Sequence, residues 1–273
     1  MNFKKFNFAR KRNGVIGVLN VLLGKIGLKF RIKTALDLRI EWIGNYVKKC
    51  TNNIVYSGLY KGMKIYENNF WSNKDISSKL LGVYELEVQE AIFNSQKNIK
   101  KKNLINLGGG DGYHLVGLLK SGIFENSIVF EIDENGRNII SKNLEINGQT
   151  SKVEILSEAN KSSLLSTIKK LNLKECFFLI DIEGNEYKLL DKEILNKLSN
   201  SNILIELHRS DKENLDLIEN LKAIYNIDIF CTKYRDLSKF KFLHVLEDND
   251  RWLSVSEHRP GTMYWVMCTP RLN

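Results

Sequence analysis

Short apolar runs alternate with helical patterns along most of the chain. Seven runs have the length and the β-branched or aromatic content of strands. They cover residues 103–107, 127–131, 152–156, 176–182, 202–206, 226–231 and 263–269. Between the first five, apolar residues recur at helical intervals, as at Ile139, Ile140 and Leu144. Because strands that alternate with helices build a mostly parallel sheet covered on both faces, the pattern predicts a doubly wound α/β fold.

The segments beside these strands complete the predicted architecture. One amphipathic helix is expected over 78–96, a second over 113–119 and a third over 185–198. The turn signal His258-Arg-Pro-Gly261 precedes the last run, so we expect the last strand to return antiparallel to its neighbour.

The first 54 residues have a different character and predict a basic helical extension before a domain over 55–273. A basic start is followed by the apolar run Val15 to Leu23. That run is shorter than the ~18 apolar residues that a membrane span needs, and no secretory cleavage site follows it. Two interpretations remain open: a basic amphipathic helix on an anionic membrane, or a helix docked on its own domain.

Charge separates this extension from the rest of the chain. The formal net charge is +9, from 41 Lys and Arg against 32 Asp and Glu. Residues 1–50 carry 12 of these basic and 2 of these acidic residues, which leaves 29 and 30 for the remainder. The body therefore has no basic bias, and no nucleic-acid partner is expected. Contact of residues 1–50 with the inner face of a membrane stays open.

Composition and cysteine spacing indicate an ordinary folded protein of the cytoplasm. A hydrophobic content of 43% with only two prolines excludes disordered and collagen-like classes. Cys50, Cys176, Cys231 and Cys268 form no Cys-x-x-Cys pair and no spacing suited to zinc. We expect them to be reduced residues of the core.

A glycine-rich turn follows the first strand and leads into a helix. Its predicted ligand contacts are Gly108, Gly109, Gly110, Asp111, Gly112 and Tyr113. A dinucleotide-binding turn places a third small residue where Tyr113 stands, so that a pyrophosphate can bind at the helix N-terminus. The turn therefore favours a ligand without phosphates. The alternative is a glycine-rich turn that binds nothing.

Acidic residues after the second and third strands suit an adenosine-containing ligand. Glu131 lies nineteen residues beyond Gly112, where a carboxylate can accept both ribose hydroxyls, and Ile132 follows it. Glu158 follows the third strand and is within reach of an adenine amino group, although a solvated loop carboxylate is an equal alternative. Asp133 has a simpler role, as the cap of the next helix.

The fourth and fifth strands end in residues suited to proton transfer. Asp181 and Glu183 follow the fourth strand, while Glu206 and His208 end the fifth. Asp181 and His208 are the candidate general bases, with Glu183 or Glu206 in positioning roles. Asp181 is also a predicted contact of the adenosyl ligand. A structural role for His208 remains open. A cation shared by these carboxylates would require them to converge, which the sequence does not show, so no metal is expected.

Several blocks together resemble the FkbM-like family of class I S-adenosylmethionine-dependent methyltransferases. The strongest is Ile180-Asp-Ile-Glu-Gly-Asn-Glu-Tyr-Lys-Leu189, which is similar to that family's D-x-E-G-x-E block. Asn143-Leu-Glu-Ile-Asn-Gly148 and Glu257-His-Arg-Pro260 extend the similarity, which covers about 55–270. Asn106 departs from it, because such enzymes often carry an acid there.

The resemblance implies a fold, a cofactor and a reaction. The fold is a seven-stranded mostly parallel sheet with an antiparallel last strand, the cofactor is S-adenosyl-L-methionine, and the reaction is O-methylation. The implied acceptor is a small-molecule or glycan hydroxyl, on a sugar, a polysaccharide or a secondary metabolite. We expect the segment 232–262 to cover the acceptor pocket or to pack its aromatic residues on the sheet.

Two other functions share part of this pattern. A nicotinamide-dependent oxidoreductase would also have the glycines and Glu131, but it should lack Tyr113 and the acids after the fourth strand. A membrane-surface or nucleic-acid adaptor would act through the basic residues 1–50.

Overall fold

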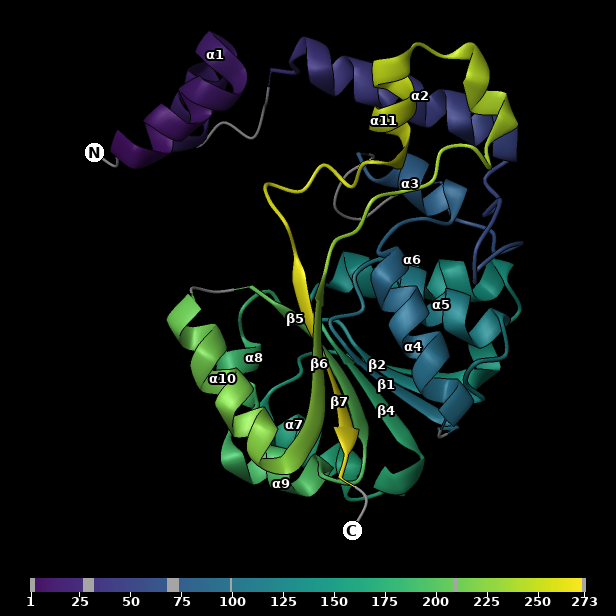
Figure 1. The fold of residues 1–273 in the computed structure, drawn as a ribbon, viewed down its shortest axis with the longest axis vertical. Helices are drawn as coiled ribbons and strands as arrows, with labels where there is room; N and C mark the ends of the chain where they lie inside the picture. Colours follow the sequence, from purple (N-terminus) through teal and green to yellow (C-terminus); the bar gives the residue numbers. More distant parts are fainter. Residues whose placement is uncertain (1–2, 27–31, 68–73, 99, 209–210, 272–273) are drawn as a thin grey trace.

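A computed structural model describes residues 3–26, 32–67, 74–98, 100–208 and 211–271 (Figure 1). The strands are β1 (Asn103–Leu107), β2 (Asn126–Phe130), β3 (Val153–Leu156), β4 (Cys176–Ile180), β5 (Asn202–Leu207), β6 (Tyr225–Cys231) and β7 (Tyr264–Pro270). The α-helices are α1 (Phe3–Lys25), α2 (Ala35–Thr51), α3 (Ile76–Leu81), α4 (Leu86–Asn98), α5 (Tyr113–Lys120), α6 (Glu134–Ile146), α7 (Lys161–Ile168), α8 (Glu186–Leu189), α9 (Lys192–Leu198), α10 (Asp211–Ile224) and α11 (Asp248–Val255). Short 3₁₀ turns cover Thr150–Lys152, Leu173–Glu175 and Lys241–Val245.

All seven strands form one sheet in the order β3-β2-β1-β4-β5-β7-β6. The first five strands are parallel, whereas β7 runs antiparallel to both β5 and β6. This order and the reversed β7 are those of a class I methyltransferase fold, so the predicted fold class is confirmed. Each predicted strand is present, with its ends within two residues of the expected positions.

Helices cover both faces of the sheet, because buried side chains alternate along each inner strand. Phe177 and Leu179 of β4 join the core under α4, α5 and α6, while Phe178 and Ile180 join the core under α7, α9 and α10. Figure 1 shows these helices as two layers on either side of the strands.

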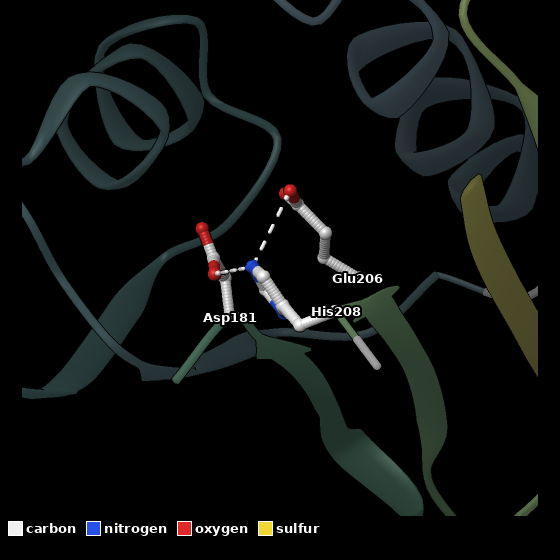
Figure 2. A group of neighbouring side chains, drawn as sticks. All are labelled: Asp181, Glu206 and His208. Carbon is white, nitrogen blue, oxygen red and sulfur yellow. Dashed lines mark ion pairs between the residues drawn. The ribbon is translucent and has the colours of Figure 1, made fainter. Parts of the chain in front are cut away.

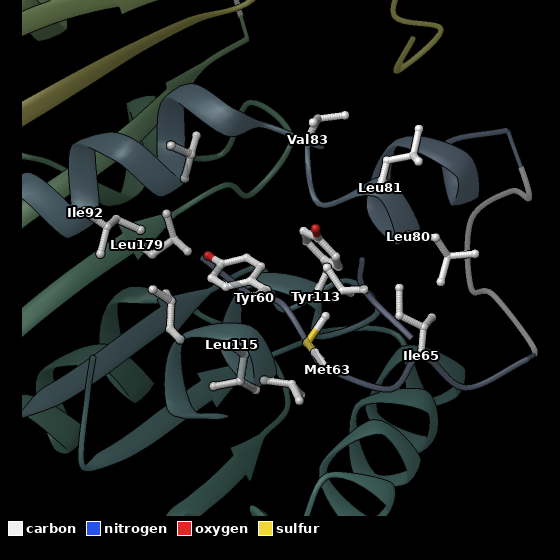
Figure 3. Close-up of a cluster of buried hydrophobic side chains, with 14 of the residues drawn as sticks. Tyr60, Met63, Ile65, Leu80, Leu81, Val83, Ile92, Tyr113, Leu115 and Leu179 are labelled. Atoms are coloured by element: carbon white, nitrogen blue, oxygen red, sulfur yellow. The ribbon is translucent and has the colours of Figure 1, made fainter. Parts of the chain in front are cut away.

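Residues 55–65, which follow α2, insert into the first of these cores (Figure 3). Tyr60 and Met63 lie against Tyr113 and Leu115 of α5. A Cβ on Gly117 would lie 2.4 Å from the Tyr60 ring, so only a glycine lets the helix approach this closely.

The division of the chain into an extension over 1–54 and a domain over 55–273 remains a prediction.

Three helices, α2, α3 and α11, form a cap beyond the carboxyl ends of the parallel strands (Figure 1). Arg39 of α2 donates from Nε to Asp250 Oδ1 of α11 at 2.8 Å, and Asp250 is buried. In α2, Thr34 and Asp37 form a capping box in which each side chain accepts the other's backbone N–H. The pair of Arg39 with Asp250 therefore connects two helices of the cap that are more than 200 residues apart in sequence.

Two expected helices are each divided in the structure. The helix predicted over 78–96 breaks between α3 and α4, because Gly82 and Glu85 have positive φ of 81° and 43°. A Cβ on Gly82 would lie 2.0 Å from the Ser57 carbonyl oxygen, so the break also allows a close backbone approach. The helix predicted over 185–198 divides into α8 and α9, since Asp191 caps the backbone N–H of Ile194.

The N-terminal helix α1 lies apart from the sheet in Figure 1. Val15, Leu19, Leu22 and Ile26 are 75%, 40%, 45% and 71% exposed, so this face is not docked on the domain. None of the described helices is long and apolar enough to cross a bilayer.

The cysteines agree with the sequence prediction only in part. All four are free thiols, and Cys176 and Cys268 are buried in strands as expected. Cys50 is exposed at the end of α2 and Cys231 is only half-buried at the end of β6, so neither is a fully buried core residue.

Candidate functional site

The glycine turn brings the end of β1 against the end of β4. Gly108, Gly110 and Gly112 all have positive φ, of 87°, 56° and 81°. A Cβ on Gly108 would lie 1.6 Å from the Asp181 carbonyl oxygen, so no other residue fits without moving the backbone. Gly112 is the N-cap residue immediately before α5 and lines neither of the two cavities described below.

Glu131 connects this turn to the loop after β2. Its Oε2 accepts the Gly110 N–H at 2.7 Å and its Oε1 accepts the Asp133 N–H at 2.9 Å. The side chain is only 5% exposed. Each carboxylate oxygen keeps a second lone pair, so the expected hydroxyl contacts remain chemically open. Asp133 caps α6 through the N–H groups of Asn135 and Gly136, which confirms its predicted capping role.

A cavity of about 580 Å³ lies beside the turn, over the carboxyl ends of β1, β2 and β4. Six of the predicted ligand contacts line it, namely Gly108, Gly110, Glu131, Ile132, Glu158 and Asp181. Ile132 is 71% exposed although its neighbour Glu131 is buried. An apolar side chain left open on a cavity wall is suited to cover the face of a flat, apolar ligand group.

A second cavity of about 280 Å³ lies on the other side of the turn, below the cap. The predicted contacts Gly109, Asp111 and Tyr113 line this smaller cavity and not the larger one. Gly108, Gly110, Asp181 and Glu183 line both cavities. The two spaces therefore meet at the glycine turn and the end of β4.

Asp111 and Tyr113 face a buried lysine in the smaller cavity. Lys79 is 6% exposed and donates to Asp111 Oδ2 at 2.6 Å, and its Nζ lies 2.8 Å from Asp75 Oδ2. Burial opposes the lysine charge, but these two carboxylates raise the pKa of Lys79 above its usual value. The Tyr113 hydroxyl donates to the Lys79 carbonyl oxygen at 3.1 Å. The predicted contacts on this side are thus engaged within the protein.

The ends of β4 and β5 bring Asp181, Glu206 and His208 together, as Figure 2 shows. His208 Nε2 lies 3.3 Å from Asp181 Oδ1, 3.5 Å from Glu206 Oε1 and 3.8 Å from Glu183 Oε2. On the other side of the ring, Nδ1 lies 3.2 Å from Glu186 Oε1. Glu186, which is fully buried, thus joins the acids around one imidazole.

These neighbours change the protonation of the cluster. Burial raises the pKa of Asp181 to about 6, although His208 acts in the opposite direction. Burial favours a neutral imidazole, but hydrogen bonding to Glu186 and the charge of Asp181 raise the pKa of His208 overall. A carboxyl group that titrates near 6 is suited to exchange protons near neutral pH.

Arg259 is a central residue of the site that the sequence did not single out. Its Nη1 donates to Glu206 Oε1 at 2.7 Å, its Nε donates to Glu257 Oε2 at 3.0 Å, and its Nη2 donates to Glu85. Glu206 also accepts from Trp265 Nε1 at 3.2 Å. The available signal was Arg259 in the Glu257-His-Arg-Pro260 block, but its three acidic partners lie 174, 53 and 2 residues away in sequence.

Strained backbone gathers around the smaller cavity. Glu85, Glu183 and His258 have positive φ, of 43°, 54° and 55°, and all three line it. A non-glycine residue keeps a left-handed backbone conformation only where the surrounding structure holds it, and such residues are often found at functional sites. Of the segment 232–262, residues 257–259 line the cavity, whereas Tyr234 is 97% exposed and Phe240 is buried in the core.

Comparisons with solved structures find methyltransferases among the similar folds. An O-methyltransferase from Bacillus cereus in complex with SAH is 11% identical, with a TM-score of 0.47 over 93% of this chain and 97% of that one. A precorrin-6y C5,15-methyltransferase from Geobacter metallireducens is 11% identical, with a TM-score of 0.44 over 67% and 89%. An rRNA methylase from Streptococcus thermophilus is 10% identical, with a TM-score of 0.43 over 67% and 96%. Likeness of this degree carries no inference about ligand or activity, and the fold assignment rests on the strand order.

No protein-family model and no curated protein matches the chain. The resemblance to FkbM-like enzymes therefore stays a prediction.

Proposed function

We propose that the protein is an S-adenosylmethionine-dependent methyltransferase that acts on a hydroxyl group. The observation that carries this proposal is the meeting of two cavities at Gly108, Gly110, Asp181 and Glu183. One cavity offers walls suited to an adenosyl group, and the other offers the carboxylates of Asp181 and Glu183 to a second molecule. A group-transfer enzyme needs two such spaces with one shared boundary.

The larger cavity fits the cofactor chemically. Ile132 would cover the adenine face, Glu131 would accept ribose hydroxyls through its remaining lone pairs, and Glu158 would approach the adenine amino group. When bound, S-adenosylmethionine supplies an electrophilic methyl group on a sulfonium centre. The protein's own contribution is to hold that group beside the smaller cavity and to exclude other orientations.

The acids and His208 would serve the acceptor. Asp181, with a pKa of about 6, can accept the hydroxyl proton and becomes a neutral acid as it does so. His208, with Nε2 3.3 Å from Asp181 Oδ1, can orient that carboxyl group. Most of the acceleration would come from alignment of the two reactants, because transfer to oxygen is an in-line displacement. The acceptor class, a sugar, polysaccharide or secondary-metabolite hydroxyl, rests on the FkbM-like resemblance. The acidic lining of the smaller cavity supports it, since carboxylates bind polyhydroxyl groups well.

A nicotinamide-dependent oxidoreductase is the rival for the same glycines. The buried ring of Tyr113 at the third small position and the antiparallel β7 both favour the methyl donor. Calorimetric titration of the full chain with S-adenosylhomocysteine and, separately, with NAD⁺ tests the choice. We expect saturable binding of S-adenosylhomocysteine alone. Saturable binding of NAD⁺ alone would overturn the proposal.

A substitution in the larger cavity tests where that ligand binds. We expect Ile132→Asp to weaken S-adenosylhomocysteine binding by about 10- to 100-fold, because covering an isoleucine contributes ~1.5–3 kcal/mol. Val245→Asp is the matched control, since Val245 is 79% exposed and lines neither cavity. Equal affinities of both variants would place the adenosyl group elsewhere.

A further inference from the structure

Three donor atoms of different residues converge between the two cavities. One ligand atom each of Asp181, Glu206 and His208 lies within 4.8 Å of the other two (Figure 2). They follow or end the neighbouring strands β4 and β5, which pair in parallel with Ile180 opposite Ile205, so their carboxyl ends lie side by side. Ligands about 2.1 Å from one cation are ~3.0–3.5 Å apart at ordinary coordination angles. The separations of His208 Nε2 from Asp181 and Glu206, 3.3 and 3.5 Å, match that spacing.

The hydrogen bonds around the cluster leave one position that a cation or a proton can fill. If His208 Nδ1 donates to Glu186, a neutral ring turns the lone pair of Nε2 toward the oxygens of Asp181 and Glu206. Three acceptors then face one another. Asp181 Oδ1 is itself buried and has no hydrogen-bond donor among the described residues. A second proton on His208, a proton on Asp181 or Glu206, or a metal ion between these atoms would resolve the conflict.

The surrounding residues hold the donors in place. Glu206 is fixed by Arg259 and Trp265, and His208 is oriented by Glu186. Ligating histidines are usually held in this way, by a hydrogen bond from the other ring nitrogen to a carboxylate. Arg259 opposes a nearby cation, but Glu85 and Glu257 also bind its guanidinium and offset its charge. Asp181 and Glu183 thus retain negative charge for a further cation.

We propose that Asp181, Glu206 and His208 bind a divalent transition-metal ion, with Mn²⁺ as the probe. An imidazole nitrogen among oxygen donors favours such ions over Mg²⁺ or Ca²⁺, which prefer oxygen alone. Asp181 and Glu206 line the smaller cavity, so the open coordination positions face the acceptor space. A role of this ion in acidifying the acceptor hydroxyl rests on the proposed function, whereas the binding of the ion does not.

Electron paramagnetic resonance tests the site on the full chain after removal of metals with EDTA. Free Mn²⁺ gives a sharp six-line signal that is lost on binding, so a titration at pH 7.5 gives both affinity and stoichiometry. We expect one Mn²⁺ per chain. We also expect Asp181→Asn and His208→Ala to weaken binding by at least about 10-fold. Asp228→Asn and His244→Ala are the matched controls, because both residues are exposed and distant in sequence from the cluster.

A second measurement does not depend on the variants folding. Pulsed spectra of the wild-type Mn²⁺ complex should contain the ¹⁴N modulation of a coordinated imidazole. Absence of tight Mn²⁺ binding, or binding without that modulation, would overturn the metal site. Binding of S-adenosylhomocysteine is measured in parallel, so a chain that binds it but no Mn²⁺ refutes the metal alone. A chain that binds Mn²⁺ but no S-adenosylhomocysteine refutes the proposed function alone.

Discussion

At the scale of single residues, close approach explains the glycine turn better than flexibility does. Several glycines of the chain have positive φ, but they meet different surroundings. Gly108 meets the Asp181 carbonyl oxygen, whereas a Cβ on Gly122, with φ of 71°, would meet nothing within 4 Å. The backbone contact at Gly108 is what sets the two cavities on either side of one turn.

This difference predicts the outcome of two alanine substitutions. Gly122→Ala introduces only left-handed strain and should lower the free energy of unfolding by about 1 kcal/mol. Gly108→Ala adds a backbone collision and should cost at least ~2 kcal/mol more, with loss of S-adenosylhomocysteine binding. Urea denaturation and calorimetry measure the two effects. Equal stability of the two variants would contradict the observed approach of β1 to β4.

Site residues that are close in sequence or at strand ends could be predicted, whereas contacts between distant segments could not. The glycines, Glu131 and Ile132 lie near one another in sequence or at strand ends, and the structure places all of them at the larger cavity except Gly109 and Gly112. The approach of Arg259 to Glu85 and Glu206 depends on tertiary folding over long sequence separations. No local pattern of charges encodes such an approach.

At the scale of elements, strands were predicted more accurately than helices. Short apolar runs bounded by polar residues define a buried strand almost completely. The division of 78–96 depends on the positive φ of Gly82 and Glu85, and both residues contact segments distant in sequence: Gly82 approaches Ser57, and the Glu85 N–H donates to Glu257. Likewise, the convergence of Asp181 with His208 follows from β4 and β5 being neighbours, which strand order alone establishes.

The cap offers a test of its own at the start of α2. Asp37 closes the capping box and pairs with Lys74, and these hydrogen bonds hold the pKa of Asp37 well below its usual value in spite of burial. A depressed pKa means that the unfolded state binds the proton more readily, so this stabilisation is present above about pH 4 and is lost as pH falls.

Asp37→Asn should therefore destabilise the protein by about 1 kcal/mol at pH 7 and by less at pH 3. Urea denaturation at the two pH values measures the difference. Asp228→Asn, at an exposed position of β6, should leave stability unchanged at both. A penalty for Asp37→Asn that is larger at pH 3 would refute the assigned role of its charge.

At the scale of the whole molecule, α1 is the part that the fold does not account for. Val15, Leu19, Leu22 and Ile26 are all exposed, and the first three belong to an apolar run that continues around the helix from Val15 to Leu23. Before Asp37 the chain contains no acidic residue, while basic residues stand on both sides of this apolar run. The basic charges would repel a second copy of the helix, whereas an anionic lipid surface would attract the charges and take up the apolar run.

We therefore expect the full chain to sediment with vesicles that contain phosphatidylserine and not with neutral phosphatidylcholine vesicles, and to be released by added salt. Replacing Leu19 and Leu22 with Asp should abolish sedimentation, because it removes apolar contact and adds negative charge. Leu215→Asp is the matched control, since Leu215 is 59% exposed and belongs to α10, which lies apart from α1 in Figure 1. A parallel measurement with duplex DNA separates a membrane-surface adaptor from a nucleic-acid adaptor. Vesicle binding that survives the double substitution would show that charge alone attracts the protein. Binding to DNA in preference to vesicles would refute a lipid partner for α1.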